Sequence, residues 1–574
     1  MNPLVDEIAR RVGGVLDVPT ADVRELMTTP PDDSMGDYAL PCFALAQRLR
    51  RSPAEIAQEL AEAIVGDPIR DAQAAGPYLN VTVDRGELMS HVLGRVLQEG
   101  ERFGGSDEGA DQTIVIDYSS PNIARPFSVG HLRSTVLGHT LKLIHRHLGY
   151  DVVGVNYLGD WGKQFGALIA AYKRWGSREQ VEADRVYELF RLYVDFHEEA
   201  ETTPELEDEA RHWFQKLEAG DAEATDLWEW FVAESLEAFR TYYDMLGIEF
   251  EEIRGESAYR DQASPLIERL MEEGIAQESE GAIVIPLEAD EADADADRPP
   301  LMLRKRDGAT VYATRDLCAA IYHQQQYEFD WKLYVVDAGQ SLHFQQFFEA
   351  LTKMGYDWAE RLVHVAFGVV LFEDQRMSTR KGRVVFFEDV AQQAIDRTRE
   401  IIENVAKIAD LPQAEREQIA HDVGVSAVIY ATISRSRTHD INFRWEDVVN
   451  FEGKSGPYIQ YTHARMAGVL RKADRQVPEA PAYARLTERS EVALAKWIEQ
   501  FPDKVRHAAE TYDPFTVAAY LGDLAAVVNK FYDTCRVLGE DAELEGARLA
   551  LVQSAQTVLA TGLGLIGMSA PERM

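Results

Sequence analysis

The hydrophobic positions between residues 113 and 157 predict a strand, a helix and a second strand in close succession. Thr113–Tyr118 is an apolar, β-branched run of strand length, and Asp151–Tyr157 is another. The chain from Gly130 onward has helical period, and Gly149 stands where a helix usually ends. Apolar side chains recur there at Leu132, Val136, Leu137, Leu141, Ile144 and Leu148. The polar turn before Gly130 is therefore expected at a helix N-terminus and at the carboxyl end of a parallel sheet, which favours phosphate binding.

The same kind of pattern divides the chain into three regions. Residues 1–110 mix helical stretches with a short strand at Tyr78–Val83 and predict an α+β domain. Residues 111–387 alternate strands with helices around a long helical insertion at Lys163–Gly247, which predicts a parallel-sheet α/β domain. Residues 388–574 have helical period almost throughout and predict an all-α domain. The elements expected after the insertion are a strand at Lys332–Asp337, a helix at Ser341–Gly355 and a strand at Leu362–Leu371.

Length and apolar content favour a soluble α/β multidomain protein. The chain has 574 residues, which is material for about three domains. It contains no uncharged apolar run of membrane-spanning length, and its first residues lack an apolar signal region, so we expect a cytoplasmic protein without a membrane partner. Cys42, Cys318 and Cys535 are isolated in apolar surroundings. They predict buried thiols rather than a disulfide framework or a metal site.

The charge of the chain is strongly negative. Aspartate and glutamate total 97 against 59 lysines and arginines, a formal net charge of -38. This sign is wrong for a protein that binds nucleic acid through a generally basic surface. It is typical of proteins that work in molar salt, where the Debye length falls to about 3 Å and an acidic surface no longer repels a polyanion at a distance. We therefore expect a halophilic protein, with an ordinary acidic mesophilic enzyme as the alternative.

Six short segments, in order along the chain, resemble the signatures of one family. The first is Pro121–Thr135, which contains the polar turn and the tripeptide Val-Gly-His, and the last is the terminal Pro571–Met574. Between them lie Leu158–Gly166 (LGDWGKQFG), Tyr312–Asp316 (YATRD), Gln340 and Gly456–Ala473 (GPYIQYTHARMAGVLRKA). Any single match is weak, but six in the same order make coincidence improbable. Over nearly its whole length the chain resembles the arginyl-tRNA synthetases, a class I aminoacyl-tRNA synthetase family.

The resemblance implies that the protein ligates L-arginine to tRNA(Arg) in two steps. The arginine carboxylate attacks the α-phosphate of ATP, with Mg²⁺ present as the ATP complex, and pyrophosphate leaves. The arginyl group is then transferred to the 3'-terminal adenosine of the tRNA. Because no protein nucleophile is needed, catalysis consists of alignment and stabilisation of phosphate charge. The resemblance also implies a Rossmann-type catalytic domain, a monomer, and arginine activation that waits for tRNA.

Two signatures would handle ATP. In the first, His131 can donate a hydrogen bond to phosphate at the helix N-terminus, and Gly130 allows close approach because it has no Cβ atom. Ser128 replaces a histidine that the wider class usually has, and a hydroxyl cannot become cationic. The second signature, at Arg376–Arg383, departs from the usual KMSKS and reads RMSTRKGR. The residues assigned by resemblance to ATP or catalysis are Arg125, Ser128, Gly130, His131, Met377, Ser378, Arg380 and Lys381. The sequence leaves open which of the last two reaches the phosphates.

Recognition of arginine needs a carboxylate that accepts the guanidinium in a forked geometry, beside an aromatic or hydroxyl group. Tyr312 and Asp316, four residues apart, could offer that pair from one helix face. The resemblance assigns this pair to the guanidinium, and Asn122 and Gln340 to the α-amino and carboxylate groups. Asp117, where the family often has glutamate, is a further carboxylate near the substrate. No editing domain is expected, because a buried polar site can reject lysine and citrulline without one.

Two sets of residues would contact the tRNA. Tyr458, Tyr461, His463 and Arg465 form a helical patch near the C-terminus that could stack on or pair with anticodon bases. Tyr78 and Asn80 in the N-terminal region are candidates for the elbow of the tRNA. Each assignment has a structural alternative. The alternative for His131 is a helix cap or a surface position, and for Asp316 an N-cap or an ion pair with Arg315. A solvated basic turn is the alternative for the second ATP signature, and core packing for the tyrosines near the C-terminus.

Three other functions are compatible with part of this pattern. A class I synthetase for glutamate or cysteine would share the ATP signatures, but Tyr312–Asp316 argues against both. A nucleotidylyltransferase would share the fold but would not need a long all-α domain. A catalytically inactive paralogue that binds tRNA or acts as a scaffold is the third, and Ser128 and the altered second signature favour it.

Overall fold

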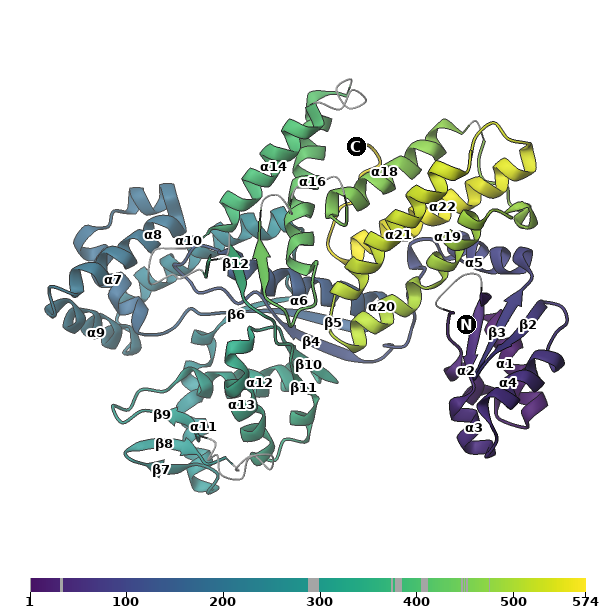
Figure 1. The fold of residues 1–574 in the computed structure, drawn as a ribbon. Helices are drawn as coiled ribbons and strands as arrows, with labels where there is room; N and C mark the ends of the chain where they lie inside the picture. Colours follow the sequence, from purple (N-terminus) through teal and green to yellow (C-terminus); the bar gives the residue numbers. More distant parts are fainter. Residues whose placement is uncertain are drawn as a thin grey trace.

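The computed structural model describes most of the chain, namely residues 2–30, 35–287, 299–372, 375–376, 385–403, 411–444, 448, 450, 453–473 and 475–574. Figure 1 shows a central sheet with a helical insertion at one end of the molecule and the N-terminal domain at the other. The C-terminal helices lie between the sheet and the N-terminal domain. The described helices include none that is long and apolar enough to cross a membrane.

A five-stranded parallel sheet forms the centre of the molecule. Its strands are β4 (Thr113–Asp117), β5 (Asp151–Leu158), β6 (Glu252–Gly255), β10 (Trp331–Tyr334) and β11 (Leu362–His364). They lie in the order β11-β10-β4-β5-β6. The chain moves outward from β4 through β5 to β6 and then returns to the opposite side of β4. The strand order therefore reverses between β4 and β10, and in such sheets ligands bind outside the carboxyl ends of the strands at this point.

Alternation along the strands gives the sheet two buried faces. Ile114 and Ile116 of β4 pack into one core, whereas Val115 packs into the other. The first core includes the apolar side of α6 (Val129–His147). The second is covered by α11 (Arg260–Glu272), α12 (Tyr312–Tyr327) and α13 (Ser341–Lys353). The predicted parallel sheet is confirmed, including its first strand, turn and helix.

The two insertions extend the catalytic region away from the sheet. The helical one consists of α7 (Lys163–Trp175), α8 (Arg178–Ala200), α9 (Glu205–Glu218) and α10 (Ala222–Leu246), as predicted. A smaller antiparallel sheet follows, formed by β7 (Gln277–Ser279), β8 (Ala282–Ile285) and β9 (Leu301–Arg304). Both insertions leave the carboxyl end of the central sheet open.

The N-terminal domain is α+β, as predicted. Its antiparallel sheet has the order β1-β3-β2, and the central strand β3 has the predicted bounds Tyr78–Val83. The other elements are α1 (Pro3–Leu16), α2 (Thr20–Leu26), β1 (Tyr38–Pro41), α3 (Phe43–Leu49), α4 (Pro53–Ala63) and β2 (Ile69–Ala75). The next helix, α5 (Arg85–Glu99), packs against C-terminal helices. All three cysteines are buried, as predicted.

Among its described residues, the C-terminal part of the chain forms helices, with one strand as the exception. Its helices are α14 (Phe387–Glu403), α16 (Gln413–Ile433), α18 (Gly456–Lys472), α19 (Arg489–Glu499), α20 (Phe501–Glu510), α21 (Phe515–Thr534) and α22 (Ala542–Leu565). The exception is β14 (Ile441–Phe443), which pairs in parallel with β12 (Val370–Phe372). The sequence has helical period almost throughout this region, and it could not indicate β14, because a three-residue strand is too short to give a period of two.

The prediction of a single strand at Leu362–Leu371 was wrong. The structure divides this apolar run between β11, in the central sheet, and β12, in a separate three-stranded sheet with β14 and β13 (Gln375–Arg376). Two short buried strands in succession give one continuous hydrophobic run, so the pattern could not separate them.

Candidate active site

A cavity of about 830 Å³ opens at the carboxyl ends of β4 and β10, where the strand order reverses. Nine of the residues predicted for ATP or arginine line it. They are Asp117, Asn122, Arg125, Ser128, Gly130, His131, Tyr312, Asp316 and Gln340. Asp117 ends β4, Ser128 precedes α6, and Tyr312 and Asp316 lie on the first turns of α12. The fold thus brings together residues that are up to about two hundred positions apart in sequence.

His131 is held at the N-terminus of α6 by Ser128. The backbone N–H of Ser128 donates a hydrogen bond to Nδ1 of His131 across 3.1 Å, and the Ser128 hydroxyl lies 3.1 Å from the same atom. Because Nδ1 accepts a hydrogen bond, the ring proton is on Nε2. Burial, with the nearby charge of Arg125, lowers the pKa of His131 to about 4. His131 is therefore a neutral imidazole with a single N–H, and Nε2 has no partner among the described residues.

Arg125 lies at the edge of the cavity and is held by the helical insertion. Its guanidinium is 5.3 Å from the centre of the Tyr193 ring on α8 and donates to the Tyr193 hydroxyl at 3.3 Å. The cation stays half-buried and faces the same cavity as His131. It is therefore placed to contact an anionic ligand at the start of α6.

The four residues assigned to ATP from the second signature, Met377, Ser378, Arg380 and Lys381, lie outside the described residues. The chain that follows this signature is described and adjoins the first signature. The N–H of Val129 donates to the carbonyl of Val385 at 3.1 Å, and the N–H of Phe387 donates to the carbonyl of Phe127 at 2.9 Å. The chain from Val385 onward is thus paired with the first signature at the N-terminus of α6.

The opposite side of the cavity is acidic. Asp117 is almost completely buried and accepts a hydrogen bond from the Ser120 hydroxyl at 3.0 Å. Burial raises the pKa of Asp117 to about 6, although the positive charge of Lys332 opposes the shift. Asp316 lies 3.0 Å from Nε2 of His343. A hydrogen bond to that carboxylate would leave its second oxygen for a ligand.

The ion pair that was the alternative for Asp316 does not form. Arg315 instead pairs with Glu256 at 2.7 Å, on the far side of the first turn of α12. Tyr312 is 54% exposed, and its ring centre lies 5.0 Å from that of His343. Tyr312 and Asp316 therefore share the face of α12 that borders the cavity.

Asn122 is fixed by the segment that resembles LGDWGxQFG. The N–H of Ile123 donates to the carbonyl of Gly159, and the N–H of Gly159 donates to the carbonyl of Pro121. A Cβ atom on Gly159 would lie 2.3 Å from Oδ1 of Asn122, so only glycine permits this approach. This contact explains why the segment carries glycine beside the cavity.

Sequence reasoning missed several charged or titratable residues of the cavity. Glu256, Lys332 and His343 all line it. Burial raises the pKa of Glu256 to about 7, against the opposing charge of Arg315. Lys332 is completely buried, and the signal that could have found it is a lysine inside an otherwise apolar strand. Glu256 and His343 carry no comparable signal, because each stands in an ordinary polar stretch.

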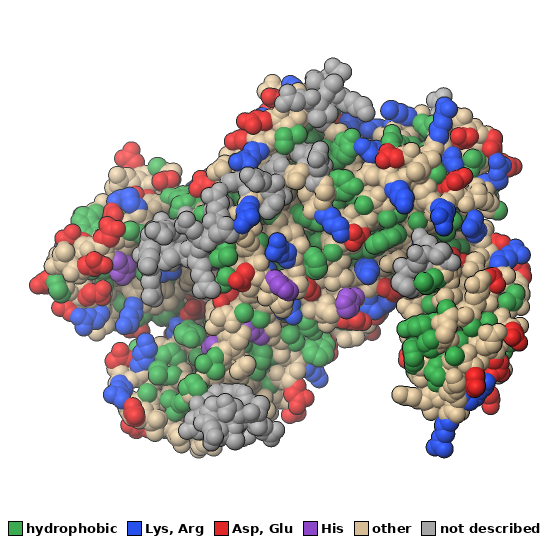
Figure 2. All heavy atoms as spheres, in the orientation of Figure 1, with side chains coloured by type: hydrophobic (Ala, Val, Ile, Leu, Met, Phe, Trp, Pro, Cys, Tyr) green, Lys and Arg blue, Asp and Glu red, His purple; other side chains and the backbone are tan. Residues whose placement is uncertain are grey.

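The helical patch near the C-terminus is only partly accessible. The Arg465 guanidinium lies between the rings of Tyr461 and Tyr532, 4.9 Å and 5.0 Å from their centres. Tyr458 accepts a hydrogen bond from Asn529 at 3.0 Å. Figure 2 shows Lys and Arg side chains gathered over these C-terminal helices. This arrangement offers aromatic and cationic groups together, as stacking on a base requires.

His463 does not belong to that exposed patch. It is 2% exposed, and its Nδ1 lies 3.0 Å from the carbonyl of Pro571. Its Nε2 lies 3.2 Å from the side-chain amide of Gln556. In this position the His463 ring holds the C-terminal tail and is not open to an anticodon base, so its contact with tRNA stays a prediction.

The two candidates in the N-terminal domain differ in exposure. Tyr78 is 42% exposed and packs edge-on against Phe43, which is 49% exposed. Asn80, two residues along the central strand, is 9% exposed. Tyr78 and Phe43 thus form the apolar surface that a partner could cover, and Asn80 lies beneath it.

Three family models match successive parts of the chain. They are described as arginyl tRNA synthetase N terminal domain (residues 3–83), tRNA synthetases class I (R), catalytic domain (residues 92–445) and DALR anticodon binding domain (residues 459–574). The catalytic match alone covers more than half of the chain. Its end lies just after β14, which agrees with the pairing of β14 with β12.

Full-length relatives and solved structures agree with these matches. The chain is 46% identical to an arginine–tRNA ligase of Clostridioides difficile over 561 residues, 97% of each chain. It is 42% identical to an arginine–tRNA ligase of Halothermothrix orenii, over 100% of this chain and 99% of the other. The solved Thermus thermophilus arginyl-tRNA synthetase superposes with a TM-score of 0.81 and 27% identity, covering all of both chains.

Proposed function

The chain belongs to the arginyl-tRNA synthetase family, and from this premise we propose which of its residues bind arginine, ATP and tRNA. The protein ligates L-arginine to tRNA(Arg), first forming arginyl-adenylate from ATP and then transferring the arginyl group to the 3'-terminal adenosine. The observation that carries the assignment is the division of one cavity into an acidic side and an anion-binding side. Arginine has a cationic end and a carboxylate that must meet the α-phosphate, so it would span this cavity.

We propose that the start of α6 binds the phosphates of ATP. His131 would donate a hydrogen bond from Nε2 to oxygens of the α-phosphate. The backbone N–H groups of the first turn of α6 would add to the positive potential there. Gly130 would admit the nucleotide closely, and Ser128 would orient His131. Arg125 would contact the leaving pyrophosphate, together with the residues Met377, Ser378, Arg380 and Lys381 of the second signature. Mg²⁺ would enter as the ATP complex and neutralise part of the triphosphate charge.

The acidic side is the proposed arginine site. Asp316 and Tyr312 would receive the guanidinium, and Asn122 and Gln340 would hold the α-amino and carboxylate groups. Asp117 would supply a second carboxylate near the cationic substrate. With the guanidinium and the α-amino group fixed, the substrate carboxylate would point toward His131 and the α-phosphate, which is the alignment that adenylate formation needs.

For tRNA, we propose that Tyr461 and Arg465, with Tyr458 behind them, stack on anticodon bases. Tyr78 would contact the elbow of the tRNA, with Asn80 shaping the strand beneath it. The domains we propose are 1–110, 111–387 and 388–574. Strand β14 belongs to the third domain in sequence but pairs with β12 of the second. We also propose a cytoplasmic monomer adapted to high salt. Two features support this adaptation: the net charge of -38, and exposed ion pairs between arginine and carboxylate side chains.

Charging of total tRNA with each labelled amino acid in turn tests the assignment. We expect arginine alone to be attached, in the presence of ATP and Mg²⁺. Retained tRNA binding without any charging would identify an inactive paralogue. We further expect little ATP–pyrophosphate exchange until tRNA(Arg) is added, and robust exchange in tRNA-free enzyme would contradict that expectation.

A further inference from the structure

A buried lysine lies at the acidic side of the cavity, where the proposed function gives it no role. Lys332 on β10 has no exposed surface, yet it is among the lining residues. Its Nζ atom contacts Nδ1 of His323 on α12 and lies 4.7 Å from the centre of the Tyr334 ring. An uncompensated buried ammonium is costly, so its retention calls for a compensating interaction.

The strand register places Lys332 beneath Asp117. Tyr334 of β10 is the Cα partner of Asp117 on β4, and Lys332 is two residues earlier on the same face of the sheet. Neighbouring strands lie about 4.8 Å apart and residues i and i+2 about 7 Å apart, so a lysine side chain can extend to the region under the Asp117 carboxylate. In the part of the chain that the structure describes, no carboxylate oxygen lies within ion-pair distance of Nζ.

Asp117 differs in its partners from Asp316 and Glu256, two other carboxylates of the cavity. Asp316 has His343 and Glu256 has Arg315, whereas Asp117 has only the Ser120 hydroxyl among the described side chains. Burial works against the ionised form of Asp117, and the charge of Lys332 is the largest influence in the opposite direction. Removing that charge would therefore favour the protonated form.

We propose that Lys332 is a positioning residue for arginine, whose buried charge keeps the Asp117 carboxylate ionised so that it can receive the cationic substrate. This inference rests on the proposed placement of arginine beside Asp117. Lys332 acts through Asp117 and does not touch the reacting atoms. Its effect appears in the binding of arginine and in the pH range over which binding holds, and not in the handling of ATP.

The surroundings of Lys332 define what else could titrate there. The groups that face it or Asp117 from the packed elements are Asp117 on β4, Glu252 on β6, Tyr259, Asp316 and His323 on α12, and Tyr334 on β10. Glu252 is already held by Arg254 and Tyr327. The tyrosines have raised pKa values and stay neutral below pH 9, and burial with the charge of Lys332 keeps His323 neutral. Among these groups Asp117 changes charge near pH 6. Glu256, which lines the same cavity and pairs with Arg315, has a pKa of about 7, and burial lowers the pKa of Lys332 itself to about 8.

The test compares Lys332→Met with the wild-type protein in steady-state charging of tRNA(Arg) between pH 5.5 and 8.5, with ATP and tRNA saturating. In the wild type, the KM for arginine should rise as the pH falls through about 6, the pKa of Asp117. In Lys332→Met that rise should begin about one to two pH units higher, with a KM about two- to tenfold above wild type at pH 7 and convergence at pH 8.5. The KM for ATP and kcat should change less than about threefold.

Two further variants separate charge from packing. Lys332→Arg keeps the charge and should keep the wild-type pH profile, even if its overall KM rises. His323→Leu removes the hydrogen-bonding partner of Lys332 Nζ but leaves the charge of Lys332. This variant should also keep the wild-type pH profile. Asp117→Asn should give an arginine KM that is raised and independent of pH, and adding Lys332→Met to it should cause little further change. Because the arginine and leucine variants retain the cation, they test the idea even if Lys332→Met does not fold.

A Lys332→Met profile parallel to that of the wild type would overturn the inference, as would a shifted profile in Lys332→Arg. An effect in the double variant equal to the product of the single effects would also overturn it. A wild-type protein that failed to charge arginine would instead overturn the proposed function. A second readout is calorimetry of arginine binding at pH 7 in two buffers of different ionisation enthalpy. Lys332→Met should release about half a proton or more per arginine, and the wild type less than about 0.2.

Discussion

The backbone N–H of Ser128 donates to Nδ1 of His131, and this one hydrogen bond decides which nitrogen of the imidazole faces the cavity. Capping of the helix and donation to phosphate had been alternatives for His131. The geometry allows both, because Nδ1 serves the helix start and Nε2–H remains on the other side of the ring. The same hydrogen bond gives Ser128 a role in orienting His131. The backbone of Ser128 fills this role, so it does not require the histidine that the wider class usually has at this position.

His131→Ala should lower kcat for charging by about 10²- to 10³-fold, as expected for loss of one donor to a developing phosphate charge. The KM for arginine should change less than about threefold, because the acidic side of the cavity is untouched. Steady-state charging of tRNA(Arg) measures both. Ser128→Ala is the matched control. It keeps the backbone N–H that orients the ring and should lower kcat less than about tenfold, and an equal loss in both variants would refute this division of roles.

Asp316→Asn should reduce kcat/KM for arginine by about 10- to 100-fold, because a charged hydrogen-bonding partner of the guanidinium becomes neutral. The KM for ATP should stay within about twofold of the wild-type value. Asp503→Asn makes the same chemical change on an exposed side chain of α20 and should leave both constants unaltered. A loss confined to ATP would show that Asp316 does not face the amino acid.

Tyr461→Ala should raise the KM for tRNA(Arg) by about 5- to 100-fold, the range expected for one lost base-stacking platform. The KM for arginine should not change. His463→Leu should instead weaken the docking of the tail at Pro571 and lower the unfolding midpoint, with a tRNA KM close to wild type. A large and specific loss of tRNA affinity in His463→Leu would mean that its ring leaves the core when tRNA binds.

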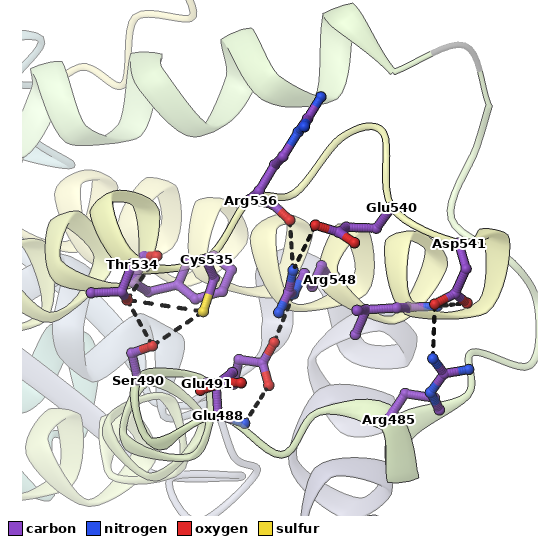
Figure 3. Close-up of polar contacts among 12 residues, drawn as sticks. Arg485, Glu488, Ser490, Glu491, Thr534, Cys535, Arg536, Glu540, Asp541 and Arg548 are labelled. Carbon is purple, nitrogen blue, oxygen red and sulfur yellow. Dashed lines mark hydrogen bonds and ion pairs between the residues drawn. The ribbon is translucent and has the colours of Figure 1, made fainter.

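The buried ion pair between Glu491 on α19 and Arg548 on α22 joins two C-terminal helices (Figure 3). Its side chains are 0% and 8% exposed, and Arg548 also donates to the carbonyl of Arg536 at 2.7 Å. Arg548→Met should lower the free energy of unfolding by about 3 to 5 kcal/mol, because it leaves the buried carboxylate of Glu491 without its cationic partner. Urea denaturation measures the change.

Arg485, which precedes α19, supplies the control for that measurement. It pairs with Asp541 (Figure 3) and with Glu543 at the start of α22, at the surface where solvent screens the charges. Arg485→Met should leave the urea midpoint unchanged. Similar losses in the two variants would mean that the burial of Glu491 is not what makes its pair important.

Salt should stabilise the protein and support charging. At low ionic strength the net charge of -38 repels itself and repels tRNA, and molar KCl screens both effects. The thermal unfolding midpoint and the rate of arginine charging should therefore rise between 0.1 M and 2 M KCl. An optimum for both near physiological salt would establish the acidic mesophilic alternative.

The sequence by itself determined the elements that local pattern controls. The run of apolar residues fixed β4, β5 and α6, and the turn between them carried Ser128, Gly130 and His131 to a helix N-terminus. The four-residue spacing of Tyr312 and Asp316 placed both on one helix face. These features depend on neighbours within one or two turns, so they can be predicted without knowing what packs against them.

The tertiary structure alone decided what depends on distant partners. The division of 362–371 between two sheets follows from the pairing of β12 with β14, about seventy residues later. His463 is hidden because the C-terminal tail docks on it, although helical spacing places it beside Tyr461 and Arg465. Lys332, Glu256 and His343 meet Asp117 and Asp316 only because β4, β10, α12 and α13 converge on one cavity. The energies of buried charges are set by such convergence, which no local pattern records.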